Sequence, residues 1–380
     1  MIHTGVIKLS NQCELHYYGI YGGPQGLKEI FSEVNLQPGL QFHVIDPLTK
    51  LQQIPYDQLK SCDPAKTLVV ISTGESHGYP EYHQIIDKLT DYCGIDPMHI
   101  VMYTGCMEDT GPNYNIGTIV PHVANTFATP QLKSYKKYSR FHKSTPTHHF
   151  VCLNRAPAWQ RATLVELLLD HGLDQYGAIS YGTLLSEFEL ANLGKYPYDH
   201  LMFPLKYKNR LPLVVDKPTV TIADGFSVSN PKISCAFFNV ITETSYESHC
   251  EITQEHYGVQ NATLTEKSYK CFLLGQVPIW LSSYRTVHWA REFGFDVFDD
   301  IINHDYDTEL DPTRRIHMVV NEIQRVCDTY TVPDLVNLEK KLKPRLKKNY
   351  QVLKSWSQGH VADVPRWLTY FNKVGLINDG

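Results

Sequence analysis

The sequence predicts an α/β protein with two open-sheet domains that face each other across a cleft, followed by C-terminal helices. Three observations lead to this prediction. The 380 residues exceed what one hydrophobic core usually organises, so two domains are expected. Strand-like and helix-like stretches alternate in the first third of the chain, and a second alternating series begins near residue 149. Such alternation indicates mainly parallel sheets that are covered on both faces.

The first alternating series defines a first domain, predicted to span residues 1–145. Its strand-like stretches are ELHYYGIYGG, LQFHVID, TLVVIST and HIVMYTG, and its helix-like stretches are GLKEIFSEV and EYHQIIDKLTDYCGI. Gly19, Gly22, Gly23 and Gly26 form a glycine-rich turn at the end of the first of these stretches, but not a G-x-G-x-x-G fingerprint, so no dinucleotide site is expected there. The domain ends where the basic, polar stretch 130–148 interrupts the apolar pattern.

The second alternating series defines a second domain, predicted to span residues 146–330. It contains HFVCLNR, AWQRATLVELLLDHGL, TVTIAD, KISCAFFNVITE, TEKSYKCFLLGQ, VPIWLSS, HWAREFGF and TRRIHMVVNEIQRV. Residues 331–380 look helical and are expected to pack back across the domains. In open α/β sheets, ligands bind beyond the carboxyl ends of the strands. We therefore expect the functional site at those ends.

Composition narrows the class of protein. Hydrophobic residues at 42% and charged residues at 20% are typical of a soluble globular protein, and the net charge of -5 argues against wrapping nucleic acid through the overall field. The start of the chain lacks a signal peptide or membrane anchor, so a cytoplasmic location is expected. The nine cysteines form no C-x-x-C pair and favour a reducing compartment, with Cys152, Cys235 and Cys271 expected in the core.

An acid and a base stand side by side in NATLTEKSYKCFLLGQVPIWLSS, at Glu266 and Lys267. Thr263 or Thr265 is suited to cap a helix, Gly275 to end it, and VPIWLS to form the buried strand that follows. The pair then lies in the first turn of a helix, where free N–H groups favour a bound phosphate. The plainer alternative is that Glu266 only caps the helix and Lys267 is a solvated surface residue.

The surrounding sequence resembles a known family of enzymes. The stretches ISCAFFNVITETSYE, TLTEKSYKCFLLGQVPIWLSS and REFGFDVFDDIINHDYD, between residues 233 and 307, resemble the donor-binding half of the α-1,3-fucosyltransferases and of related viral and bacterial glycosyltransferases. A weaker resemblance extends back to FVCLNRAPAWQR. The resemblance implies two Rossmann-like domains in the GT-B architecture, an N-terminal acceptor domain and a C-terminal domain that binds a nucleotide-diphosphate sugar.

The resemblance also implies a set of donor-binding residues. Glu266 would hold the ribose, Lys267 and Arg161 would neutralise the diphosphate, and Glu243 would lie near the sugar or ribose. The complete expected set is Asn154, Arg161, Glu243, Tyr246, Thr263, Glu266 and Lys267. The family often carries an aromatic residue where this chain has Thr263, so the sugar and the base, including GDP-fucose, stay open. For Arg161 and Glu243, a helix-surface cation and a strand-end carboxylate are the plainer alternatives.

Transfer of a sugar requires charge stabilisation on the departing diphosphate and a base for the acceptor hydroxyl. Arg161, Lys267 and a helix N-terminus could supply the first without a metal, and the family implies inversion at the anomeric carbon. Asp305 and Asp307 form a D-x-D pattern, for which a role in the loop is expected rather than metal binding. No cofactor is expected besides the nucleotide sugar as co-substrate.

The general base is expected from the first domain. Glu75 and His77 follow the apolar strand VVIST, where a loop would face the cleft, and either could deprotonate an acceptor hydroxyl. The alternative is that Glu75 caps the next helix and His77 is a solvated loop residue.

Two basic stretches, 132–143 and 340–354, contain no acidic residue. Such stretches usually form solvated faces, but with interleaved aromatic residues they could also hold DNA or an anionic glycan. Three hypotheses therefore stay open. The first is a glycosyltransferase acting on a glycan or another hydroxylated acceptor, the second is an enzyme that glycosylates modified DNA bases, and the third is a non-catalytic nucleotide- or glycan-binding protein of the same fold.

Overall fold

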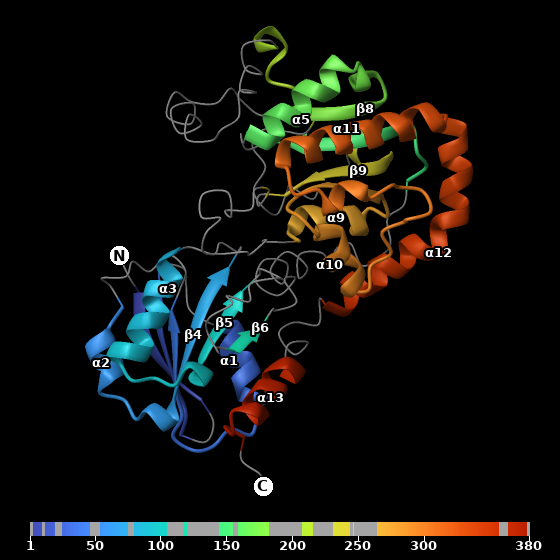
Figure 1. Ribbon diagram of the computed structural model, residues 1–380. Helices are drawn as coiled ribbons and strands as arrows, with labels where there is room; N and C mark the ends of the chain where they lie inside the picture. Colours follow the sequence, from blue (N-terminus) through green and yellow to red (C-terminus); the bar gives the residue numbers. More distant parts are fainter. Residues whose placement is uncertain are drawn as a thin grey trace. The chain divides into compact units, whose positions relative to one another are not determined.

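The computed structural model describes residues 3–9, 12–19, 25–45, 54–74, 80–104, 117–119, 144–154, 159–181, 207–215, 231–243, 246, 264–356 and 364–377 (Figure 1). These residues form two compact units. Unit 1 contains the described residues up to 119 together with 356 and 364–377, and unit 2 contains those from 144 to 355. Both units combine parallel strands with helices, so the predicted α/β class is confirmed.

Unit 1 is built on a six-stranded sheet whose strands follow one another in sequence order. Parallel pairing joins all neighbours except β1 and β2, which pair antiparallel. The edge strands β1 and β6 are additions that the sequence patterns did not predict. The strands are β1 (His3–Lys8), β2 (Glu14–Gly19), β3 (Gln41–Ile45), β4 (Thr67–Gly74), β5 (Ile100–Thr104) and β6 (Gly117–Ile119).

Helices cover both faces of the unit 1 sheet, as predicted. On one face, α1 (Gln25–Ser32) and α13 (Val364–Lys373) share a core that contains Phe31 and Trp367. On the other face lie α2 (Tyr56–Lys60) and α3 (Pro80–Asp87), which continues as a π-helical turn over Lys88–Tyr92. Short 3₁₀ turns at Pro64–Lys66 and Pro97–His99 lead into β4 and β5. Because α13 is the last described helix of the chain, the chain returns to unit 1 after it has formed unit 2.

Unit 2 contains a parallel four-stranded sheet in the order β8-β7-β9-β10. The strands are β7 (His148–Asn154), β8 (Gly177–Tyr181), β9 (Ala236–Thr242) and β10 (Val277–Leu281). From β7 the chain adds β8 on one side and then β9 and β10 on the other, so the order reverses between β7 and β9. In open α/β sheets, such a reversal opens a crevice at the carboxyl ends of the two strands, and ligands bind there.

The helices of unit 2 are α5 (Trp159–Asp170), the short α8 (Pro231–Ser234), α9 (Glu266–Leu273), α10 (Thr286–Glu292), α11 (Pro312–Thr329) and α12 (Val332–Trp356), with 3₁₀ turns at Leu173–Gln175, Lys208–Arg210 and Asp305–Thr308. Figure 1 shows α11 beside α5 within this unit. The stretch KISCAFFNVITE begins with the turn of α8 and continues as β9. The stretch TVTIAD lies outside the described residues.

Helix α9 and the strand after it agree with the sequence prediction. Thr265 is the N-cap, and its hydroxyl accepts the N–H of Lys267. Gly275 adopts φ 61°, and the N–H groups of Gly275 and Gln276 donate to the carbonyls of Phe272 and Cys271. These two bonds form the Schellman motif that ends helices at a left-handed residue. Strand β10 follows and is fully buried at one end of the unit 2 sheet.

The predicted cysteine placement is correct at two of three positions. Cys152 and Cys271 are fully buried, whereas Cys235 is only half-buried because it follows α8, just before β9 begins. Burial raises the pKa of the Cys152 thiol to about 12, so this thiol stays protonated. None of the helices in the described part of the chain combines the length and the apolar composition needed to cross a membrane.

Candidate functional site

The carboxyl ends of β7 and β9 lie side by side at the reversal in strand order and carry polar side chains. Asn154 ends β7 and Thr242 ends β9, and the Thr242 hydroxyl donates to the Asn154 side-chain oxygen at 2.5 Å. Arg161, in the first turn of α5, donates from Nη2 to the Thr242 carbonyl at 3.4 Å. The structure thus brings Asn154 and Arg161 together through Thr242. Thr242 could have been identified from the sequence, because it is the polar residue that ends the strand just before Glu243.

Glu243 fastens the start of α9 to the end of β9. Its carboxylate is fully buried and accepts hydrogen bonds from the Thr265 N–H at 2.9 Å, the Ser268 hydroxyl at 2.7 Å and the Thr265 hydroxyl. A buried carboxylate is tolerated only when such donors satisfy it. In the structure, Glu243 therefore positions the start of α9. Its predicted contact with a sugar or ribose stays a prediction.

Lys267 lies in the first turn of α9, and its side chain turns back onto the helix cap. Its Nζ atom lies 3.1 Å from the Thr265 hydroxyl oxygen and 3.8 Å from a carboxylate oxygen of Glu243, and the side chain is 28% exposed. The Glu243 carboxylate therefore faces both the positive end of the helix and the Lys267 ammonium, and Arg161 is a second cation at this edge. Arg161 is only 6% exposed, so Lys267 is the cation of this pair that reaches the surface.

Glu266 is the first residue of α9, as predicted, while its side chain lies outside the described part of the structure. Thr263, Glu75 and His77 also lie outside the described residues. The predicted ribose contact and the predicted general base therefore stay predictions.

Tyr246 is buried and contacts other residues of unit 2. Its hydroxyl donates to the Pro312 carbonyl, and its ring lies 5.3 Å from the guanidinium carbon of Arg315. Arg315 is 2% exposed and donates from Nη1 to the carbonyls of Tyr246, at 3.1 Å, and Ser282, at 3.0 Å. The pair ties the segment after β9 to the start of α11 and the end of β10. A contact between Tyr246 and a donor stays a prediction.

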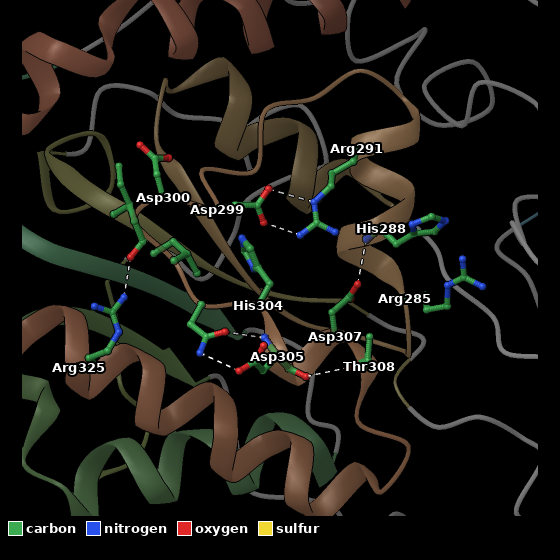
Figure 2. A pocket seen from close by; sticks show the side chains of 13 residues that line it. Arg285, His288, Arg291, Asp299, Asp300, His304, Asp305, Asp307, Thr308 and Arg325 are labelled. Atoms are coloured by element: carbon green, nitrogen blue, oxygen red, sulfur yellow. Dashed lines mark hydrogen bonds and ion pairs between the residues drawn. The ribbon is translucent and has the colours of Figure 1, made fainter.

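A pocket of about 550 Å³ lies beyond β10, between α10, the segment 299–308 and α11 (Figure 2). Its polar lining residues are Arg285, His288, Arg291, Asp299, Asp300, Asn303, His304, Asp305, Asp307, Thr308 and Arg325. Arg291 forms a two-pronged pair with Asp299, and Arg325 donates to the Ile301 carbonyl and to Glu322. The lining thus mixes both signs of charge, and it includes none of the predicted donor-binding residues.

The D-x-D pattern forms part of this pocket wall and holds α10 in place. The Asp307 carboxylate accepts the N–H groups of Val287 at 2.8 Å and His288 at 2.9 Å, and the Asp305 carboxylate accepts from the Asn303 amide at 2.9 Å. Burial raises the pKa of Asp307, against the lowering effect of those two N–H groups. The loop role expected for this pattern agrees with these bonds.

His304, one of the residues that line the pocket, is a neutral imidazole. Nε2 lies 2.9 Å from the Val297 carbonyl, so this nitrogen carries the proton, and Nδ1 accepts the Tyr306 hydroxyl at 2.8 Å. Burial is the largest influence on His304 and lowers its pKa. Within the described residues, no three or more His, Cys, Asp or Glu side chains are grouped so that they could hold a metal ion.

Comparison with models of protein families found no match for this chain, and comparison with curated proteins found none either.

Proposed function

We propose that the chain is a glycosyltransferase that moves a sugar from a nucleotide-diphosphate sugar to an acceptor hydroxyl. In this proposal the two units are the acceptor and donor domains of a GT-B enzyme. One observation carries it: the strand order of unit 2 reverses between β7 and β9, and the cations Arg161 and Lys267 stand at the carboxyl ends of those strands. Crevices at such reversals are where open α/β sheets bind nucleotides.

The proposed chemistry is a single displacement. The acceptor oxygen attacks the anomeric carbon as the bond from that carbon to the diphosphate oxygen breaks, and the hydroxyl proton passes to a general base. Negative charge develops on the diphosphate, and Lys267 together with the N–H groups at the start of α9 would stabilise it. Attack from the side opposite the leaving group inverts the anomeric carbon, and the chain's own cations would stabilise the leaving group without a metal.

The remaining roles in the proposal come from the resemblance to the fucosyltransferases. Glu266 would accept hydrogen bonds from the ribose hydroxyls, and Glu75 or His77 would remove the acceptor proton. Glu243 would act by positioning, because its carboxylate holds Thr265 and Ser268 and so sets where Lys267 stands.

The test is calorimetric titration of the protein with a panel of nucleoside diphosphates and nucleotide sugars. We expect one base to bind preferentially, and Lys267→Ala to weaken that binding about 10- to 100-fold, since a hydrogen bond to a charged group contributes about 1.5–3 kcal/mol. Lys270→Ala removes the same charge from the last turn of the same helix and is the matched control. If no nucleotide binds, or if both variants lose the same affinity, the proposed donor site is wrong.

A second measurement separates catalysis from binding alone. The preferred nucleotide sugar is incubated with the protein, and release of the nucleoside diphosphate is followed with and without a mixture of glycan acceptors. Release that Lys267→Ala lowers supports the enzyme. Tight, base-selective binding without any release would instead favour a non-catalytic nucleotide-binding protein.

A further inference from the structure

Helix α12 carries an exposed face that is rich in lysine. Five lysines within nine residues are exposed on it, and no carboxylate of the described residues lies within ion-pair distance of any of them. We call this face the lysine ridge; it consists of Lys340, Lys341, Lys343, Lys347 and Lys348. Its positive charge is local, because the whole chain has a formal net charge of -5.

The orientation of the ridge is set by the opposite face of α12. Leu342, Leu346 and Leu353 are buried there, and Asn349 donates to the Asp296 carbonyl at 2.7 Å. Arg345 also turns away from the ridge, where it forms two-pronged hydrogen bonds with Asp296 and Asp300. These contacts hold α12 against unit 2, so the ridge points to solvent.

The five lysines fall into two rows. Successive residues of a helix are turned by about 100°, so Lys340, Lys343 and Lys347 share one flank of the exposed face. Lys341 and Lys348 share the other flank, roughly 100° away by the same rule. The line between the rows carries no charge and consists of Asn337, Pro344 and Gln351.

We propose that the lysine ridge docks double-stranded nucleic acid, with each row of lysines on the phosphates of one strand. Two rows of cations on either side of an uncharged line match the two phosphate backbones that border a groove. Lysine contributes a point charge without the planar fork with which arginine reads bases, so the contact is independent of sequence.

The alternative anionic partners fit this face less well. A flat anionic membrane would meet the central line first, and that line lacks both cations and the aromatic anchors of membrane interfaces. Single-stranded nucleic acid is held by bases stacked on aromatic side chains, and none stands on the ridge. Duplex phosphate is therefore the chemistry that the two rows match.

The test is fluorescence anisotropy with a 24-base-pair DNA duplex of arbitrary sequence, measured from about 50 to 200 mM salt. Each phosphate contact adds about 0.9 to the slope of log K against log salt, so five contacts correspond to an affinity loss of about 500-fold over this range. We expect Lys341→Gln/Lys348→Gln and Lys340→Gln/Lys347→Gln each to reduce the slope by about 1.8. Removing two lysines from either row should therefore have the same effect.

The matched control is Lys8→Gln/Lys373→Gln, which removes two exposed lysines from unit 1. Its slope and affinity should equal those of the unmodified protein. Thermal unfolding of every variant should match as well, because the substituted side chains are exposed. The proposal fails if the duplex is not retained at about 50 mM salt, if the control loses as much affinity as the ridge variants, or if vesicles containing anionic lipid bind while the duplex does not.

The ridge and the proposed donor site can fail separately. The ridge variants leave Arg161 and Lys267 unchanged, so calorimetric binding of the nucleotide should be unaffected by them. Conversely, Lys267→Ala should leave duplex binding intact. If both activities are present, the acceptor class to examine first is a modified base in duplex DNA, and that step rests on the proposed function.

Discussion

Glu243 and Thr265 form the contact on which the candidate donor site depends. The carboxylate is fully buried, and among the described residues its hydrogen-bond donors come from Thr265 and Ser268, with the Lys267 ammonium at 3.8 Å. Loss of any of these hydrogen bonds should lower the stability of the protein. The buried group that loses its partner then keeps its full desolvation cost.

Replacement of Glu243 by Gln keeps the shape and removes the charge. The new amide presents a donor where the carboxylate accepted from Thr265, so we expect the free energy of unfolding to fall by about 1–3 kcal/mol. Urea denaturation measures this change. Glu292→Gln, at an exposed position on α10, should stay within about 0.5 kcal/mol of the unmodified protein. Equal stability of the two variants would contradict the anchoring role of Glu243.

We expect the stability of unit 1 to depend on pH because of His43. This histidine is fully buried on β3, and its ring stacks on the ring of His16. Nδ1 forms a hydrogen bond with the Tyr18 hydroxyl, and Nε2 lies 3.8 Å from the Cys62 sulfur. Burial, aided by the charge of His16, lowers its pKa to about 3. The unfolded state therefore binds the proton first, and the stability that neutral His43 contributes is complete above about pH 6.5 and is lost as the pH falls toward 3.

The measurement for His43 is the free energy of unfolding at pH 7 and pH 5. We expect a fall of up to about 1.4 kcal/mol per pH unit from this one group, and His43→Gln should remove that part of the slope. His99→Gln, at a half-exposed histidine of the same unit, should retain it. An unchanged slope in His43→Gln would show that another group causes the dependence.

At the scale of elements, the N-terminus of α9 links stability to the proposed function. The hydroxyl of Thr265 caps the helix, bonds Glu243 and lies 3.1 Å from the Lys267 ammonium. Thr265→Ala should cost about 1 kcal/mol, whereas Thr265→Ser keeps the hydroxyl and should restore most of it. Thermal unfolding gives the stability, and titration with the preferred nucleotide gives the binding. If Ser and Ala behave alike, the cap does not act through the hydroxyl.

At the scale of the whole molecule, the last helix belongs to the first unit. Trp367 on α13 is fully buried against Phe31 and Phe371, with ring centroids 4.9 and 5.3 Å away. Trp367→Ala should cost about 3–5 kcal/mol. Hydrogen exchange should therefore accelerate in β4 of unit 1 and stay unchanged in β9 of unit 2. Trp289→Ala, at a half-buried position on α10, is the comparison, and loss of protection in β9 with Trp367→Ala would contradict the division into units.

Local signals predicted much of unit 2. Thr265 and Gly275 mark the ends of α9 because a hydroxyl caps free N–H groups and a glycine accepts φ 61°. Patterns failed where a strand is short or its apolar residues are few, as in β1, β6 and β8 (Gly177–Tyr181). Gly177 is required by packing: an added Cβ would lie 2.6 Å from the Phe150 carbonyl oxygen, a contact between strands that no single stretch of sequence reveals.

By itself, the sequence determined the α/β class, the main strands and helices, and the position of Glu266 and Lys267 at a helix start, because periodicity and capping depend on neighbours along the chain. Only the tertiary structure decided the reversal of strand order between β7 and β9, the burial of Glu243 against Thr265, and the return of α13 to unit 1. These features join residues that are distant in sequence, and the free energy that selects them comes from packing and hydrogen bonds formed after the elements exist.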